Sequence, residues 1–97
     1  MFILIEVADR SVSVPSKFPT LELAQRCMRK TFLKTTGLTE KEFNDAYGFS
    51  IFDLNRFIED EYEIGLSEMY AYINDGPNHQ DFDWVIFDEE QIKEEME

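Results

Sequence analysis

Two segments near the C-terminus, MYAYI at 69–73 and FDWVIF at 82–87, alternate with the two-residue period of a β-strand. The residues between them, 74–81, contain an Asp-Gly-Pro-Asn sequence that favours a turn. Turn residues between two alternating segments are typical of an antiparallel β-hairpin, and this pairing constrains the rest of the fold. The side chains that we expect on the core side of the hairpin are Met69, Ala71, Ile73, Phe82, Trp84 and Ile86.

The N-terminal segment FILIEV at 2–7 is rich in β-formers and is apolar on both of its faces. This pattern indicates a central or well-covered strand. The next residues, ADRSVSVPS at 8–16, either close a small hairpin or extend the chain as far as Pro15. We expect the first strand to join the C-terminal hairpin in one antiparallel sheet.

Three segments between these strands have helical periodicity. The first spans about 20–36, with Thr20 as N-cap and Gly37 just past its end. The second spans about 40–47, where Thr39 and Glu42 have capping-box spacing. For the third, at about 51–60, the apolar spacing and a serine cap predict another helix. A short acidic helix is expected after Asp88.

The order of these elements predicts an α+β fold in which an antiparallel sheet packs against helices in two layers. The chain has 97 residues, a length that fits a single domain spanning residues 1–97. No apolar segment approaches the length needed to span a bilayer, and the N-terminus reads as a strand and not as a signal peptide. The chain has a single cysteine, Cys27, which cannot form an internal disulfide and so fits a reducing compartment. We therefore expect a cytoplasmic protein without a membrane partner.

The charge is distributed very unevenly along the chain. The net charge is −12, which argues against direct binding to nucleic acid or to an anionic membrane. Residues 1–48 carry seven basic and six acidic side chains, whereas residues 49–97 carry two basic and fifteen acidic ones. We interpret the basic positions Arg26, Arg29, Lys30 and Lys34 as the solvated face of the first helix.

The acidic half favours recognition of a basic protein. Carboxylates interspersed with aromatic side chains can imitate the phosphates of a nucleic acid and also supply anchors for a partner. The same pattern fits an inhibitor of the immunity or antitoxin kind. Mere solubilisation of the chain is the alternative. The candidate partner-binding residues are Glu59, Asp60, Glu61, Tyr62, Glu63, Glu89, Glu90 and Glu94.

The turn at 74–83 is the other candidate site, because a divalent cation could be bound by side-chain oxygens of Asp75, Asn78, Asp81 and Asp83. The spacing does not match an EF-hand loop, and a hairpin turn explains it without a ligand. A single histidine, His79, and a cysteine on the apolar stripe of a helix are too few for a zinc site or a nucleophilic pair. We therefore expect neither a cofactor nor catalysis.

The segment AYINDGPNHQDFDWVIFD resembles the C-terminal part of small uncharacterised acidic proteins from Gram-positive bacteria, phages and mobile elements. The resemblance covers residues 62–88 and implies a bacterial setting but no function. The Thr39–Phe43 segment and the acidity also resemble bacteriocin immunity proteins. Those proteins are all-helical, which the strands expected here contradict. The sequence thus predicts a non-enzymatic protein-interaction module.

Overall fold

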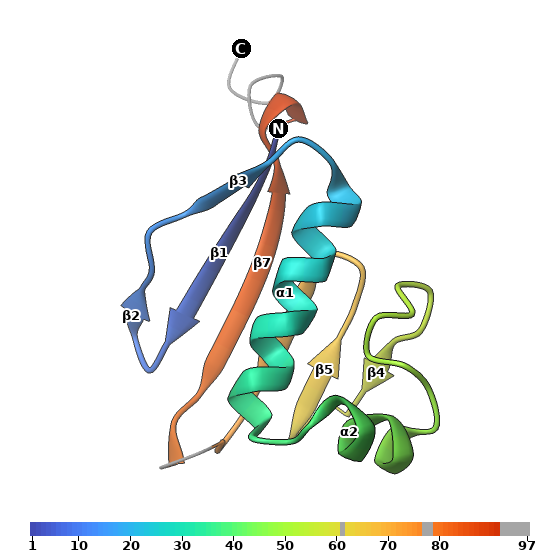
Figure 1. Ribbon diagram of the computed structural model, residues 1–97. Coiled ribbons are helices and arrows are strands. Elements are labelled where there is room, and N and C mark those ends of the chain that lie inside the picture. Colours follow the sequence, from blue (N-terminus) through green and yellow to red (C-terminus); the bar gives the residue numbers. More distant parts are fainter. Residues whose placement is uncertain (61, 77–78, 92–97) are drawn as a thin grey trace.

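The computed structural model describes residues 1–60, 62–76 and 79–91, and it has the α+β architecture that the sequence predicts. The helices are α1 (Leu21–Thr36) and α2 (Glu40–Tyr47). They lie on one side of an antiparallel sheet (Figure 1). The strands are β1 (Phe2–Ala8), β2 (Ser11–Val12), β3 (Ser16–Phe18), β4 (Ile58–Glu59), β5 (Ile64–Leu66), β6 (Tyr70–Ile73) and β7 (Phe82–Asp88).

The sheet brings the N-terminal strand beside the C-terminal hairpin, as expected. Its order is β2-β1-β7-β6-β5-β4, with β3 also paired to β1. Strands β1 and β7 pair along their full length, from Phe2 opposite Asp88 to Ala8 opposite Phe82. Of the two alternatives for residues 8–16, the structure shows the hairpin, because Val12 lies opposite Val7.

The hairpin predicted from residues 69–73 and 82–87 is confirmed by the pairing of β6 with β7. Its core-facing side chains are also confirmed. Trp84 is fully buried, and its ring packs edge-on against Phe32 of α1 with ring centres 5.7 Å apart. Phe82 and Met69 are partly buried against the same core. The central contact between the two layers therefore joins the hairpin to the long helix.

The first two predicted helices are confirmed with their caps. The Thr20 hydroxyl accepts a hydrogen bond from the Leu23 N–H at the start of α1, and Gly37 ends the helix in the left-handed conformation. At the start of α2, Thr39 and Glu42 form the complete capping box. Each bond satisfies a backbone group that the helix itself leaves unpaired.

The predicted helix at 51–60 is wrong. Residues 51–57 instead form successive turns, in which the Asp53 N–H donates to the Ser50 carbonyl and the Arg56 N–H donates to the Asp53 carbonyl. The following residues form strand β4. The acidic C-terminal helix is described only at its start, where 89–91 are helical, and its remainder at 92–97 lies outside the described residues.

The assignment of Arg29 to a solvated face is also wrong. Its side chain is 1% exposed, and its guanidinium donates hydrogen bonds to main-chain carbonyls of the turns that replace the predicted third helix. The acceptors are Ile51 at 3.0 Å, Asp53 at 2.8 Å and Arg56 at 2.7 Å. Burial lowers the pKa of Arg29, an effect that the nearby Asp53 carboxylate partly opposes. Arg29 therefore acts as a structural anchor.

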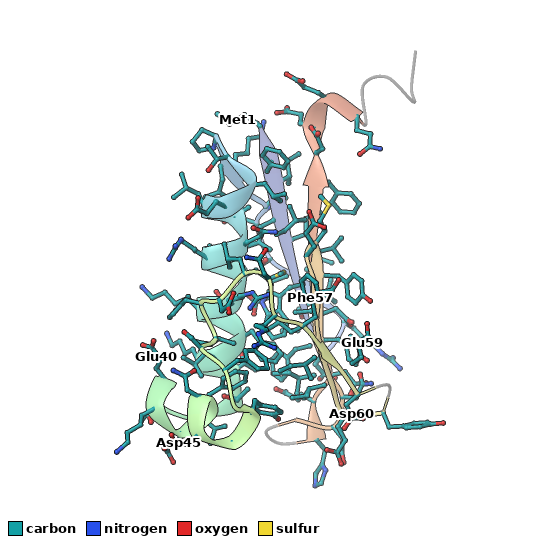
Figure 2. All side chains as sticks on the ribbon, turned by 90° about the vertical axis from the view of Figure 1, so that its right-hand side faces the viewer. Met1, Glu40, Asp45, Phe57, Glu59 and Asp60 are labelled. Carbon is teal, nitrogen blue, oxygen red and sulfur yellow. The ribbon has the colours of Figure 1, made fainter. Side chains whose placement is uncertain are left out.

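The described helices cover one of the two faces of the sheet, as Figure 2 shows from the side. Its opposite face, which we call the open sheet face, carries side chains that alternate with the core residues. All of them are partly or largely exposed. The members that carry large side chains are Ile3, Ile5 and Val7 of β1, Val85 and Phe87 of β7, and Tyr70 and Tyr72 of β6.

Candidate functional site

A cleft of about 730 Å³ opens where the end of α2 meets the turns at one end of the sheet. Two tyrosines and two carboxylates line it, namely Tyr47, Tyr62, Glu63 and Asp75. Ile64 of β5 and Ile73 of β6 add apolar surface to its wall. We call this feature the acidic cleft, because its aromatic and acidic side chains come from three separate parts of the chain.

The β4–β5 turn is held in place by backbone hydrogen bonds and by Asp60. One Asp60 carboxylate oxygen accepts hydrogen bonds from the N–H groups of Tyr62 at 3.2 Å and Glu63 at 3.3 Å. The Asn74 N–H donates to the Glu63 carbonyl at 2.7 Å, which ties this turn to the end of β6. The Tyr72 hydroxyl donates to the Asp60 carbonyl at 2.8 Å. Tyr62 and Glu63 are therefore presented from a fixed backbone.

Tyr47 is positioned by the C-terminus of α2. Its ring packs on the buried Phe43 ring with centres 4.5 Å apart, and Gly48 ends the helix directly after it. Partial burial raises the pKa of Tyr47, and the negative charges of Glu63 and Asp60 raise it further. The hydroxyl of Tyr47 thus lies in a negative potential, which disfavours the phenolate and favours a cation nearby.

The carboxylates beside the cleft differ in their pairing within the described part of the chain. Asp75 lies 2.9 Å from His79 Nδ1. Glu59, Asp60 and Glu63 have no ion pair with any described residue. Tyr62, which is 83% exposed, stands next to these carboxylates with its aromatic ring available to a partner.

The predicted partner-binding residues fall into two groups at opposite ends of the sheet. Glu59, Asp60, Tyr62 and Glu63 cluster at the β4–β5 turn, where Figure 2 labels Asp60. Glu89 lies at the Met1 end, because its N–H donates to the Met1 carbonyl at 3.0 Å, and Glu90 follows it. The other two predicted residues, Glu61 and Glu94, lie outside the described residues. The structure therefore does not form one continuous site from this set.

The candidate cation site at 74–83 is only partly assembled. The Asp75 N–H donates to the Asp81 carboxylate at 2.8 Å, so these two residues lie together. Asp83 lies on the open sheet face between Val7 and Tyr72, and Asn78 is outside the described residues. Across 1–60, 62–76 and 79–91, no group of three acidic, histidine or cysteine side chains could hold a metal ion.

Two of the four aromatic and acidic side chains that line the cleft, Tyr47 and Asp75, are not among the predicted partner-binding residues. Tyr47 lies four residues after Phe43, a spacing that is typical of two side chains packing from one face of a short helix. Asp75 was considered only as a cation ligand. No local signal links either residue to Tyr62: Asp75 comes beside it through the β5–β6 pairing, and Tyr47 reaches the same cleft from α2. Cys27 is a free thiol, partly buried against the core, as its place on the apolar stripe predicted.

Comparison of the chain with protein-family models, curated proteins and solved structures found no match. Among the described residues, no helix is both long enough and apolar enough to cross a membrane. Function is therefore inferred from the geometry and charge of the site.

Proposed function

We propose that this protein is a non-enzymatic interaction module that binds a basic partner protein through the acidic cleft. The observation that carries the proposal is the convergence of Tyr47, Tyr62 and Glu63 on one cleft. Two of these residues, Tyr62 and Glu63, lie in the acidic segment that the sequence singled out. The ligand unit that fits this chemistry is an arginine or lysine side chain of the partner.

The contacts available to such a side chain are individually modest. A cation over an exposed tyrosine ring contributes about 0.5–1 kcal/mol, and an exposed ion pair contributes a similar amount. Together they supply about 1–2 kcal/mol, whereas a dissociation constant of about 1 mM needs about 4 kcal/mol, so a short peptide must make several such contacts to bind at millimolar concentrations. Strong binding to a folded basic protein would add contacts around the cleft and electrostatic steering by the net charge of −12.

The partner class that we propose is a basic bacterial protein, which this chain would inhibit by covering its nucleic-acid-binding surface. The carboxylates of Glu59, Asp60 and Glu63, which form no ion pair with a described residue, lie near the exposed Tyr62 and support this reading. Duplex DNA would then compete with the chain for the partner. A complex that DNA does not displace would favour inhibition at another surface of the partner.

The proposal can be tested by calorimetric titration with a capped peptide of alternating glycine and arginine. We expect the Glu63→Gln and Tyr62→Ala variants each to raise the dissociation constant about 2–5-fold. Glu90→Gln is the matched control, since it removes the same charge at the far end of the sheet and should change the constant less than about twofold. Raising NaCl from about 50 to about 300 mM should weaken binding several-fold.

Equal weakening by Glu63→Gln and Glu90→Gln would contradict the proposal, because binding would then follow net charge without a site. Binding that does not respond to salt would also contradict it. An unchanged affinity in Tyr62→Ala would show that the aromatic ring of Tyr62 takes no part in recognition.

A further inference from the structure

The open sheet face is the largest feature that the proposed function leaves unexplained. In β1, side chains on both faces are apolar, with Leu4 in the core and Ile3, Ile5 and Val7 on the open side. Phe87 is 39% exposed and Tyr70 is 50% exposed on the same face. A polar outer face is usual where an antiparallel sheet meets water, so this composition indicates a face that is covered in the functional state.

The charges on this face lie near the two ends of its strands. Among the described residues, the acidic side chains that alternate onto it are Asp83 and Glu59, both near the end where β4 and β5 are joined. Lys17 lies at the other end and pairs with Glu89 at 3.4 Å. The centre, formed by Ile5, Val85 and Tyr70, is uncharged. A basic partner would find no countercharge here, whereas an apolar sheet would fit.

The size of the face suits a weak, specific dimer. Strands β1 and β7 have seven residues each, β6 has four, β5 three, and β2 and β4 two each. At about 3.3 Å per residue and about 4.8 Å between strands, the sheet covers roughly 400 Å² before side-chain relief is added. An interface of standard size takes about 800 Å² from each partner, and weak ones take less than about 600 Å².

The two halves of the face differ. One half carries the apolar side chains of β1, and the other half contains a hollow of about 350 Å³ lined by Ile58, Glu59, Tyr70 and Tyr72. A twofold axis parallel to the strands, between β7 and β6, places the β1 half of each copy over the hollow half of the other. Such contacts repeat identically on both sides, as in other symmetric dimers.

We propose that two copies of this chain associate through their open sheet faces to form a face-to-face β-sandwich. The sheets would lie about 10 Å apart, with the strands nearly aligned. The acidic clefts at the ends of the sheets stay free. Mutual repulsion of two chains with net charge −12 opposes this dimer, so salt strengthens it by screening. Salt has the opposite effect on the basic-partner complex, so the two proposals can fail separately.

The test is sedimentation equilibrium over protein concentrations from about 5 µM to about 1 mM, at about 50 and about 500 mM NaCl. We expect a reversible dimer with a dissociation constant on the order of 10–100 µM at the higher salt. Val85→Lys places a charge at the centre of the face and should weaken the dimer by about 100-fold. Lysine also lowers the net negative charge, so added repulsion between chains cannot explain the loss.

Leu23→Lys is the matched control, because Leu23 is an exposed apolar residue of α1, and its variant should dimerise like the wild type. If Val85→Lys does not fold, Tyr70→Lys changes a more exposed side chain of the same face. A wild-type chain that stays monomeric at about 1 mM in high salt would overturn the proposal. A dimer that persists in folded Val85→Lys or Tyr70→Lys would overturn it as well.

Discussion

Replacing Arg29 should destabilise the protein far more than replacing any exposed basic residue of the same helix. The buried guanidinium donates hydrogen bonds to the carbonyls of Ile51, Asp53 and Arg56, at 2.7–3.0 Å. These bonds tie the turns at 51–57 to α1. Arg29→Ala removes all three donors and leaves a cavity between the helix and the turns.

The expected magnitude follows from the number of bonds and from their surroundings. A hydrogen bond from a charged donor contributes about 1.5–3 kcal/mol, and an acceptor that stays buried without a partner costs about 1–3 kcal/mol. Two of the three bonds are only partly buried, so water can replace them, and the buried Arg29 Nε has no partner among the described atoms. We therefore expect Arg29→Ala to lower the free energy of unfolding by about 3–4 kcal/mol.

Urea unfolding followed by Trp84 fluorescence measures this change, because Trp84 is the only tryptophan and is fully buried. Arg29→Lys keeps the charge but cannot bond three carbonyls in fork geometry, so it should cost about 2 kcal/mol. Lys30→Ala, at the exposed neighbouring position, is the control and should change stability by less than about 0.5 kcal/mol. A loss below about 1 kcal/mol in Arg29→Ala would refute the anchoring role.

Other features of the structure make further predictions. The Tyr72 ring covers Gly65 so closely that a Cβ would overlap it, so Gly65→Ala should cost about 1–3 kcal/mol in the wild type and much less in a Tyr72→Ala background. Hydrogen bonds with the Thr39 N–H and hydroxyl lower the pKa of Glu42 below its ordinary value. The stability that the ionised Glu42 side chain adds is therefore fully present above the ordinary glutamate pKa, and it is lost as the pH falls through the lowered pKa. The difference in stability between the wild type and Glu42→Gln should therefore shrink in acid, and a pH-independent difference would contradict this. Because Asp75 and Asp81 lie together without a third described ligand, melting curves with about 2 mM calcium and with a chelator should coincide. A clear rise of the midpoint with calcium would restore the cation site.

The hairpin was predictable because its signal is local. Strict alternation around Ala71 and Trp84 fixes which side chains face the core, and turn residues between the segments fix their pairing. The caps of α1 and α2 are local as well, since each needs only a residue type at a fixed spacing from the helix start. These features were therefore available from residues close together in the sequence.

The two errors about 51–60 and Arg29 have one physical origin. The apolar spacing after Ser50 favours a helix, but the carbonyls that such a helix would use internally are hydrogen-bonded to Arg29. Asn44 also accepts a hydrogen bond from the Ile51 N–H, and Asp53 accepts one from the Asn55 N–H. In a sequence, a buried arginine cannot be told from an exposed one. The burial of Arg29 depends on the turns at 51–57, and those turns depend on its hydrogen bonds, so neither could be predicted without the other.

The candidate site was predictable only in part for a similar reason. The acidic segment around Tyr62 was visible as composition, but its separation from Glu89 depends on the arrangement of the strands, and its proximity to Tyr47 depends on where α2 packs. Apolar side chains on both faces of β1 predicted a strand that is covered on both sides. The described helices cover one side of it, which leaves the open sheet face.

The most direct test of the proposed function is chemical-shift mapping of the labelled protein during titration with the glycine–arginine peptide at about 50 mM NaCl. We expect saturable shifts concentrated at Tyr47, Tyr62, Glu63 and Asp75, which reverse at high salt. Shifts of equal size at Glu89 and Glu90, or a response spread over the open sheet face, would contradict the acidic cleft as the binding site.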